Sequence, residues 1–273
     1  MKLLTTFLLT GFAAVQFALE ATKPEADTVA SVATVMAPGE ELVYEVSWTF
    51  FKLGRIRLVT LAADSPGVAY RSIAYSDSYD LPFVDFHAYS TADMDSTLFS
   101  KGASLFEKNG NRWFRQLYRF SPATRTFITE NAYVNDLHQL PEAAATYDTL
   151  RLGYDRFQDG TSILYFARAH IHDGRAVAVP TVVRGKAGRT EFYLPAEKTT
   201  EHIDAVPFPI RAIQLEGKAD FEGIFGLTGD FVGWFSDDAA AVPLKAKMKV
   251  ILGSINIELV EWKRPGWSPP RGE

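Results

Sequence analysis

Hydrophobic and polar residues alternate along much of the chain beyond residue 40. The clearest case is the segment at 41–48, ELVYEVSW, in which every second residue from Leu42 onward is large and apolar. Side chains of a strand point alternately to the two faces of its sheet, so this spacing predicts a strand with one buried face. Gly54 interrupts the pattern, and residues 56–60 begin a second strand.

The same period of two predicts further strands along the rest of the chain. They lie at 70–75, 113–120, 126–129, 176–184, 190–194, 211–218, 229–235, 244–250 and 255–259. In the last pair, Lys245, Lys247 and Lys249 share a face that meets Asn256 and Glu258 across the turn. We therefore expect a hairpin whose solvated face carries cross-strand Lys–Glu pairs.

The segment at 158–170 follows a helical period instead. Ile163, Phe166 and Ala167 recur at the spacing of one helix face, and Asp159 is the natural N-cap. About ten strands with one prominent helix predict an all-β fold class. We expect a strongly curved antiparallel sheet, either a barrel or a half-barrel closed by the helix, because large twisted sheets rarely stay flat and open.

The N-terminus predicts export. Lys2 precedes an apolar run at 3–17, and polar residues follow from Glu20, which is the pattern of a secretory signal peptide. We expect this signal to occupy residues 1–21 and the protein to be periplasmic, with an uncleaved N-terminal anchor as the alternative. The apolar run is short for a membrane span, so we expect no transmembrane span in the mature chain.

The remaining chain divides by composition into three parts. We expect a flexible leader at 22–36, a single β-rich domain at 37–262 and a disordered, proline-rich tail at 263–273. The chain has no cysteine, which excludes disulfides, thiolate metal sites, cysteine nucleophiles and a lipid anchor on cysteine. Its net charge is −5, with acidic and basic residues interspersed, so we expect no nucleic-acid partner.

Motifs that carry catalysis are missing, and we assign neither catalytic residues nor cofactors. The sequence contains no Gly-x-Ser-x-Gly elbow and no glycine-rich phosphate loop before a helix. His170 and His172 could offer two imidazoles to a metal, but we expect a helix end and a loop there, hence no metal site. Asp237 and Asp238 are neighbours and would point oppositely on a strand, so we interpret them as structural residues of a polar turn.

Aromatic residues make up 13% of the chain, including twenty phenylalanines. They either pack the core of a large sheet or line a pocket for an apolar ligand. Our ligand-binding candidates are Tyr165, Phe166 and Arg168 on the helix, together with Trp234. Each also has a structural interpretation: Arg168 would pair with a carboxylate of the sheet, Trp234 would pack in the core, and Asp159 would cap the helix.

An ordered set of short motifs extends over residues 36–262. It contains Ala37-Pro38-Gly39-Glu40, residues 42–48, Gly54, Gln158-Asp159, Ser162, Tyr165, Arg168, residues 223–225, Gly229, Trp234, Ser236-Asp237-Asp238, Pro243 and Gly253-Ser254. In this order they resemble an exported bacterial family known as domain of unknown function 3108. The resemblance implies a β-rich periplasmic or envelope-associated protein and no established reaction. Gly160-Thr161 departs from the proline or apolar residue expected at the helix start.

Three functions compete. The favoured one is a non-catalytic binding module, in which a curved sheet with a helical lid holds an apolar or lipid-like envelope molecule. The first alternative is a structural or assembly factor that docks on an envelope protein, with the row of lysines at 245–249 touching an acidic surface. The second is a hydrolase of envelope polymers that uses Asp159, Asp237 or Asp238 as acid–base groups.

Overall fold

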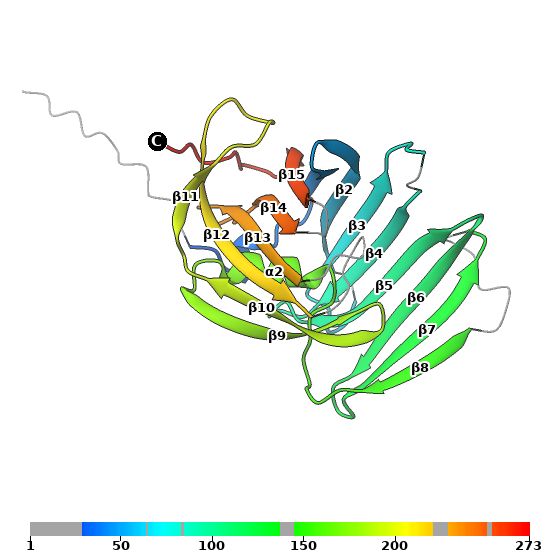
Figure 1. Cartoon of the computed structure of the whole chain (residues 1–273). Coiled ribbons are helices and arrows are strands. Elements are labelled where there is room, and N and C mark those ends of the chain that lie inside the picture. The colour runs from blue at the N-terminus through cyan, green and yellow to red at the C-terminus, as the bar shows by residue number, and fades with distance from the viewer. Residues whose placement is uncertain (1–28, 64, 83–84, 137–144, 221–228, 250–252) are drawn as a thin grey trace, which may run out of the picture.

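The computed structural model describes residues 29–63, 65–82, 85–136, 145–220, 229–249 and 253–273. Within these ranges, fifteen strands form one antiparallel sheet, and the longer of two helices lies inside the curve of that sheet (Figure 1). The strand-rich fold agrees with the alternating pattern of the sequence.

Strands fill most of the chain on either side of the longer helix. The first group is β1 Glu41–Trp48, β2 Phe51–Ala62, β3 Tyr70–Ser78, β4 His87–Met94, β5 Ser100–Asn109, β6 Arg112–Ser121, β7 Thr126–Val134 and β8 Thr146–Arg151. The second group is β9 Arg175–Val183, β10 Lys186–Leu194, β11 Lys198–Glu201, β12 Ile210–Ala219, β13 Gly229–Ser236, β14 Pro243–Lys249 and β15 Ser254–Lys263. Between them lies helix α2, Ser162–His170, and the one-turn helix α1, Val32–Val35, precedes β1.

The order of strands in space is β8-β7-β6-β5-β4-β3-β2-β1-β15-β14-β13-β12-β10-β9, with β11 added beside β12. The first and last strands of the chain, β1 and β15, therefore pair in the middle of the sheet. Strands β8 and β9 end the order, and no described residues pair them. The sheet is curved but open, which confirms the predicted fold class in its half-barrel form.

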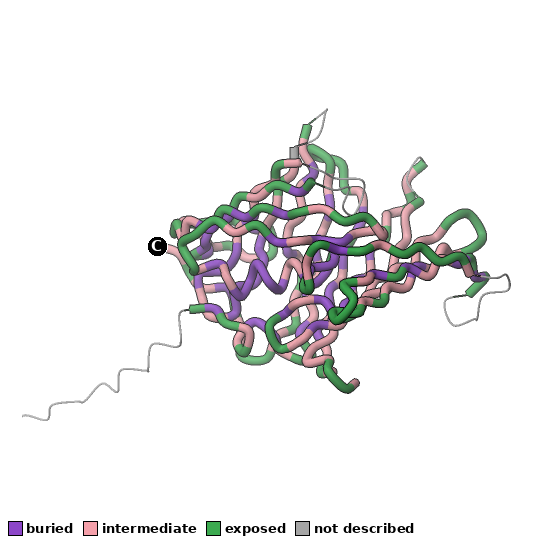
Figure 2. Tube along the Cα trace, turned by 90° about the horizontal axis from the view of Figure 1, so that it is seen from below, coloured by how far each residue is buried: buried purple, intermediate pink, exposed green. Residues whose placement is uncertain are grey.

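Burial follows the inner face of this curve. Figure 2 shows the buried residues gathered around α2 and the strands that wrap it. Leu42, Tyr44 and Val46 of β1 are buried while their neighbours are not, as the alternation predicts. On the solvated face of the last hairpin, Lys245 pairs with Glu258 at 3.0 Å, which confirms the expected cross-strand pair.

Helix α2 begins later than the sequence pattern suggests. The Asp159 Oδ1 atom accepts hydrogen bonds from the backbone amides of Thr161 and Ser162, at 2.8 Å and 2.9 Å. These amides have no partner inside the helix, so the carboxylate supplies one. Asp159 thus caps the helix start as expected, although the N-cap position belongs to Thr161 and the regular helix starts at Ser162.

The expected flexible leader is partly ordered. Residues 22–28 lie outside the described residues, but Ser31 and Thr34 form a capping box for α1, and Val35 and Met36 are buried in the core. The segment lacks a regular hydrophobic pattern, but the apolar side chains of Val35 and Met36 at its end pack into the core and hold it on the domain. The signal peptide expected at 1–21 also lies outside the described residues.

The C-terminal tail expected to be disordered is ordered in the structure. Arg264 donates to the Glu40 carboxylate and to the Thr34 carbonyl. The Trp267 indole donates to Asp238 at 2.8 Å, and Arg271 forms a bridge with Ile210. Proline-rich composition suggested disorder, but these side chains and backbone groups find partners on the domain.

Gly54 in β2 provides a test of how tightly neighbouring strands approach. A Cβ atom at this position would lie 2.8 Å from the Ser78 Cα and still closer to the Asp77 carbonyl, both backbone atoms that cannot move aside. We expect Gly54→Ala to lower the free energy of unfolding by about 1–3 kcal/mol, the usual effect of overpacking. Urea denaturation followed by circular dichroism measures this change.

Gly102→Ala in β5 is the matched control, because a Cβ there would meet only the Tyr118 carbonyl at 3.6 Å. This variant should be neutral or slightly stabilising, since glycine is costly inside a strand. Equal destabilisation by both substitutions would contradict the steric explanation.

Candidate functional site

A cavity of about 300 Å³ lies between α2 and the inner face of the sheet. Ile163, Leu164 and Ala167 line it from the helix. The opposite walls come from both halves of the sheet: Tyr44, Ile56, Leu58 and Ala74 on one side, and Phe192, Leu215, Phe231, Phe235, Ala246, Met248 and Ile257 on the other. We call this space the apolar cavity.

The lining of the apolar cavity is almost entirely hydrocarbon. Its polar members are Thr161, Thr190, Lys245 and the hydroxyl of Tyr44. Lys245 already pairs with Glu258 and with the His202 carbonyl, and the Tyr44 hydroxyl donates to the Pro243 carbonyl. Water needs several polar partners to occupy a cavity favourably, and these walls offer few. The volume falls at the lower end of the range for small-molecule sites, roughly 300–1,000 Å³. The cavity therefore suits an apolar ligand.

A buried ionic cluster holds the helix against the sheet behind this cavity. The Arg168 guanidinium donates to both carboxylate oxygens of Glu40, at 2.7 Å and 3.0 Å, and to the Ala240 carbonyl at 3.0 Å. Arg168 is fully buried and Glu40 is 1% exposed. Arg264 from the C-terminal segment also pairs with Glu40. The predicted pairing of Arg168 with a carboxylate is confirmed, and its partner stands at the entry to β1.

The charges in this cluster determine the ionisation of Glu40. Burial alone would raise the pKa of its carboxyl, but Arg168 and Arg264 outweigh burial and hold this pKa below its usual value of 4.5. A carboxyl whose pKa is lower in the folded state stabilises the fold above the unfolded pKa. That stabilisation is lost as the pH falls through the folded pKa.

We therefore expect Glu40 to contribute to acid denaturation at pH values below 4.5. Glu40→Gln, which cannot ionise, should flatten the decline of the unfolding free energy over this range, as measured by urea denaturation at a series of pH values. Glu41→Gln, at a carboxylate paired with the half-exposed Arg57, should keep the wild-type slope. Parallel curves for wild type and Glu40→Gln would show that this explanation is wrong.

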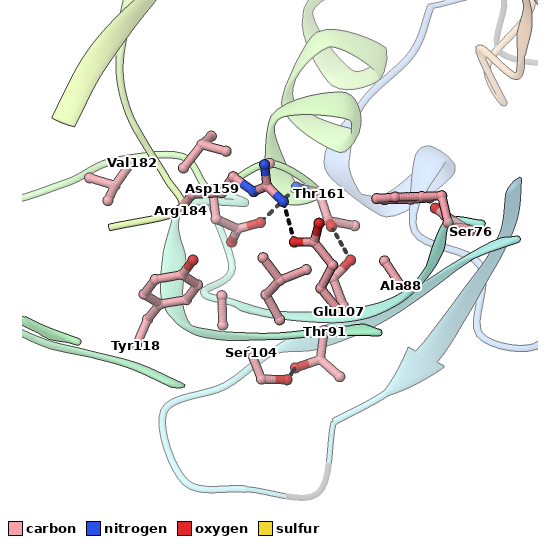
Figure 3. A pocket seen from close by; sticks show the side chains of 16 residues that line it. Ser76, Ala88, Thr91, Ser104, Glu107, Tyr118, Asp159, Thr161, Val182 and Arg184 are labelled. Atoms are coloured by element: carbon pink, nitrogen blue, oxygen red, sulfur yellow. Dashed lines mark hydrogen bonds and ion pairs between the residues drawn. The ribbon is translucent and has the colours of Figure 1, made fainter. Parts of the chain in front are cut away.

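A second, smaller hollow of about 70 Å³ adjoins the apolar cavity and differs from it in chemistry (Figure 3). The side chains of Asp159, Glu107, Arg184 and Tyr118 converge on it, as Figure 3 shows. Arg184, in the turn between β9 and β10, forms an ion pair with Glu107 of β5. We call this space the polar chamber.

Asp159 is the most buried charged group of the polar chamber, at 4% exposed. Its Oδ1 atom holds the helix start, while its Oδ2 atom has no hydrogen-bond partner in the described part of the chain. Burial raises the pKa of this carboxyl, and its hydrogen bonds with the amides of Ser162 and Thr161 offset the rise only in part. Burial also raises the pKa of Tyr118, and the charge of Asp159 adds to that rise.

The structure separates the predicted ligand-binding residues from the apolar cavity. Tyr165 bonds to the Thr60 hydroxyl at 2.9 Å, and Phe166 packs against Phe99 and Phe192. Trp234 packs in part against the core, on the opposite side of β13 from the cavity-lining Phe231 and Phe235. The fourth candidate, Arg168, is engaged in its ion pair with Glu40. None of the four candidates is among the residues that line the cavity.

Asp237 and Asp238 lie in the turn between β13 and β14, as expected. Asp238 Oδ1 accepts from the Ser236 hydroxyl and from the amides of Ala240 and Ala241. Asp237 pairs with Lys198 at 3.1 Å and with His172 at 3.5 Å. Neither aspartate lines the apolar cavity or the polar chamber.

Sequence reasoning missed Glu40, Glu107 and Arg184. One signal pointed toward Glu40: an arginine buried on the helix requires a carboxylate partner. Because the sequence contains several acidic residues that could serve, this signal did not single out Glu40. Glu107 belongs to a strand without clear alternation, and Arg184 lies in a hairpin turn, so neither residue carries a pattern that points to a site.

Two negative findings concern the described residues alone. They contain no helix that is long and apolar enough to cross a membrane. They also contain no group of three histidine, aspartate or glutamate side chains placed to hold a metal ion.

Comparison with known proteins supports the fold. No protein-family model matches the chain, and no curated protein matches it significantly. Among solved structures, the chain is similar to a β-barrel-like protein of domain of unknown function DUF1849 from Brucella abortus, with a TM-score of 0.57 and 9% sequence identity. The similarity covers 85% of this chain and 99% of the other. At this identity the similarity establishes the β-barrel-like fold and nothing further.

Proposed function

We propose that this protein is a non-catalytic binding module that holds an apolar or lipid-like small molecule in the apolar cavity. One observation carries the proposal: a hydrocarbon-lined hollow of about 300 Å³ between α2 and the inner face of the sheet. Concave, mostly apolar hollows of this size are the usual form of small-molecule binding sites. Burial of apolar surface, at roughly 25 cal/mol per Å², would supply the affinity.

Native mass spectrometry of the protein purified from its natural compartment tests this proposal. We expect a mass shift from a co-purifying apolar molecule, and uptake of fatty acyl probes by protein from which that molecule has been extracted. Protein that is always empty and takes up no probe would contradict the proposal.

We further propose that the binding takes place in the cell envelope, because the N-terminal sequence has the pattern of an export signal. The resemblance of the ordered motifs to the family of domain of unknown function 3108 is consistent with the same location. Two of the motif residues, Glu40 and Arg168, bind each other in the buried cluster, as expected of residues that a common fold would need. A fusion to a reporter enzyme that is active only in the periplasm tests the location. An inactive fusion would contradict the proposed export.

Docking on an envelope protein is a second candidate function, and a specific surface favours it. The hairpin between β1 and β2 exposes Phe50 at 77% and Phe51 at 55%, next to the partly exposed Trp48. Contiguous exposed aromatic side chains are typical of interaction sites. The lysine row is a weaker candidate, because Lys245 is engaged by Glu258 and the side chain of Lys249 lies outside the described residues.

We expect Phe50→Ser combined with Phe51→Ser to abolish co-purification of such a partner. Tyr147→Ser together with Tyr193→Ser, at two other exposed aromatic residues, should leave co-purification unchanged. Equal recovery of the partner with both double variants would remove the hairpin tip from consideration.

The hydrolase alternative has weaker support: Asp237 and Asp238 are engaged in a turn away from both hollows. Asp159 does line the polar chamber beside Glu107, but its Oδ1 atom holds the helix start and Glu107 is paired with Arg184.

A further inference from the structure

The apolar cavity and the polar chamber share a wall. Gly160 and Thr161, the residues just before α2, line both spaces. At Gly160 an added Cβ would meet only the two methyl groups of Val183, at 3.8 Å and 3.9 Å, so the missing side chain leaves room between the two hollows. A single ligand in the apolar cavity can therefore direct one end toward the polar chamber.

The chemistry of the polar chamber determines which end would fit. Arg184 is the positive group of the chamber, and Glu107 already neutralises it. Tyr118 donates its hydroxyl proton to the Gln116 side chain and so is engaged as a donor. The Oδ2 atom of Asp159, buried and without a partner among the described residues, is left as an acceptor (Figure 3).

A buried polar atom without a partner is rare in folded proteins, because its desolvation is not compensated. A ligand group that donates a hydrogen bond to Asp159 would compensate it. A carboxylate or phosphate group would instead meet Asp159 and Glu107 as like charges or as competing acceptors, which is unfavourable. The unpaired atom thus selects for a donor.

We propose that the polar chamber is the head-group site for an amphiphile whose apolar chain fills the apolar cavity and whose head is a hydrogen-bond donor, an alcohol or an amine. Asp159 Oδ2 accepts the bond from this head. The inference rests on the proposed binding function and narrows it to one class of ligand.

Calorimetric titration with three ligands of the same chain tests the inference: dodecylamine and dodecanoate below their micellar concentrations, and dodecanol below its solubility limit. We expect the amine and the alcohol to bind the wild-type protein about ten- to a hundredfold more tightly than the carboxylate, the effect of one hydrogen bond to a charged group.

Asp159→Asn should reverse this preference. Asparagine is as good a helix cap as aspartate, so its amide oxygen can replace Oδ1 and its amide nitrogen takes the place of Oδ2. The variant then presents a donor, and we expect weaker binding of the amine and the alcohol and tighter binding of dodecanoate. Asp238→Asn is the matched control, because Asp238 also accepts two backbone amides but lies outside both hollows.

The outcomes separate the two proposals. If all three ligands bind the wild type with equal affinity, the head-group inference is wrong and the binding function stands. If none of the three binds, the binding function itself is contradicted. Should Asp159→Asn fail to fold, as circular dichroism would reveal, the ranking of the three ligands on the wild-type protein still decides the inference.

Discussion

Replacement of Glu40 by methionine is expected to lower the free energy of unfolding by about 3–5 kcal/mol, the usual effect of removing one partner from a buried ion pair. The substitution leaves the Arg168 guanidinium, which has no exposed surface, with the Ala240 carbonyl as its remaining hydrogen-bond partner among the described residues. It also removes the carboxylate partner of Arg264, which keeps its hydrogen bonds to the carbonyls of Thr34 and Val35. Two positive charges would then share a site built around one carboxylate. Urea denaturation followed by tryptophan fluorescence measures the loss.

The neighbouring residue provides the control. Glu41→Met removes a carboxylate that pairs with Arg57 at 3.4 Å in a half-exposed position. Exposed pairs contribute little, so this loss should stay within about 1 kcal/mol. The double variant Glu40→Met with Arg168→Met should recover part of the stability, because apolar side chains can replace a buried ion pair. If Glu40→Met and Glu41→Met lower the free energy of unfolding by similar amounts, the buried ionic cluster is not the main interaction that stabilises the helix against the sheet.

Replacement of Ala246 by phenylalanine is expected to weaken binding of an apolar ligand at least tenfold, or about 1.4 kcal/mol. Ala246 lines the apolar cavity from β14, opposite Gly233 of β13 and Ile257 of β15. An aromatic ring at this position would occupy the volume that the ligand needs. The fold should tolerate the change, because the ring fills existing space rather than displacing packed atoms.

The matched variant is Ala178→Phe, which introduces the same ring on an exposed position of β9. It should leave affinity for dodecanol or dodecylamine unchanged, while Ala246→Phe lowers it in the same calorimetric titration. Unchanged binding by Ala246→Phe, in a protein that retains its circular dichroism spectrum, would place the ligand elsewhere.

The strands that the sequence predicted are those with one apolar face, such as β1 and β15. Strands β4, β5, β8 and the short β11 were missed, because they lack a clear alternation of large apolar and polar residues. In β8 every residue except Leu150 is exposed, so burial imposes no pattern there. Such strands are held by backbone pairing with their neighbours, which a single sequence does not reveal.

The site was harder to predict than the fold. A buried arginine on the helix indicated a carboxylate partner, but Glu40 lies 128 residues away in sequence. The cavity depends on the curvature of the sheet, which decides that Leu164 and Ala246 face the same space while Tyr165 and Phe166 face packed core. Hydrophobic periodicity identifies which face of a strand or helix is buried. It does not show whether other side chains pack against that face or leave a cavity beside it.

The pairing of β1 with β15 joins segments that are translated first and last in the domain. Contacts between such distant segments require closure of a very long loop, which slows folding. The ion pair of Glu40 with Arg264 has the same requirement. A chain that is still being synthesised therefore cannot complete its core until β15 has emerged. Before that point the apolar inner face of its sheet is exposed and can bind chaperones or membranes.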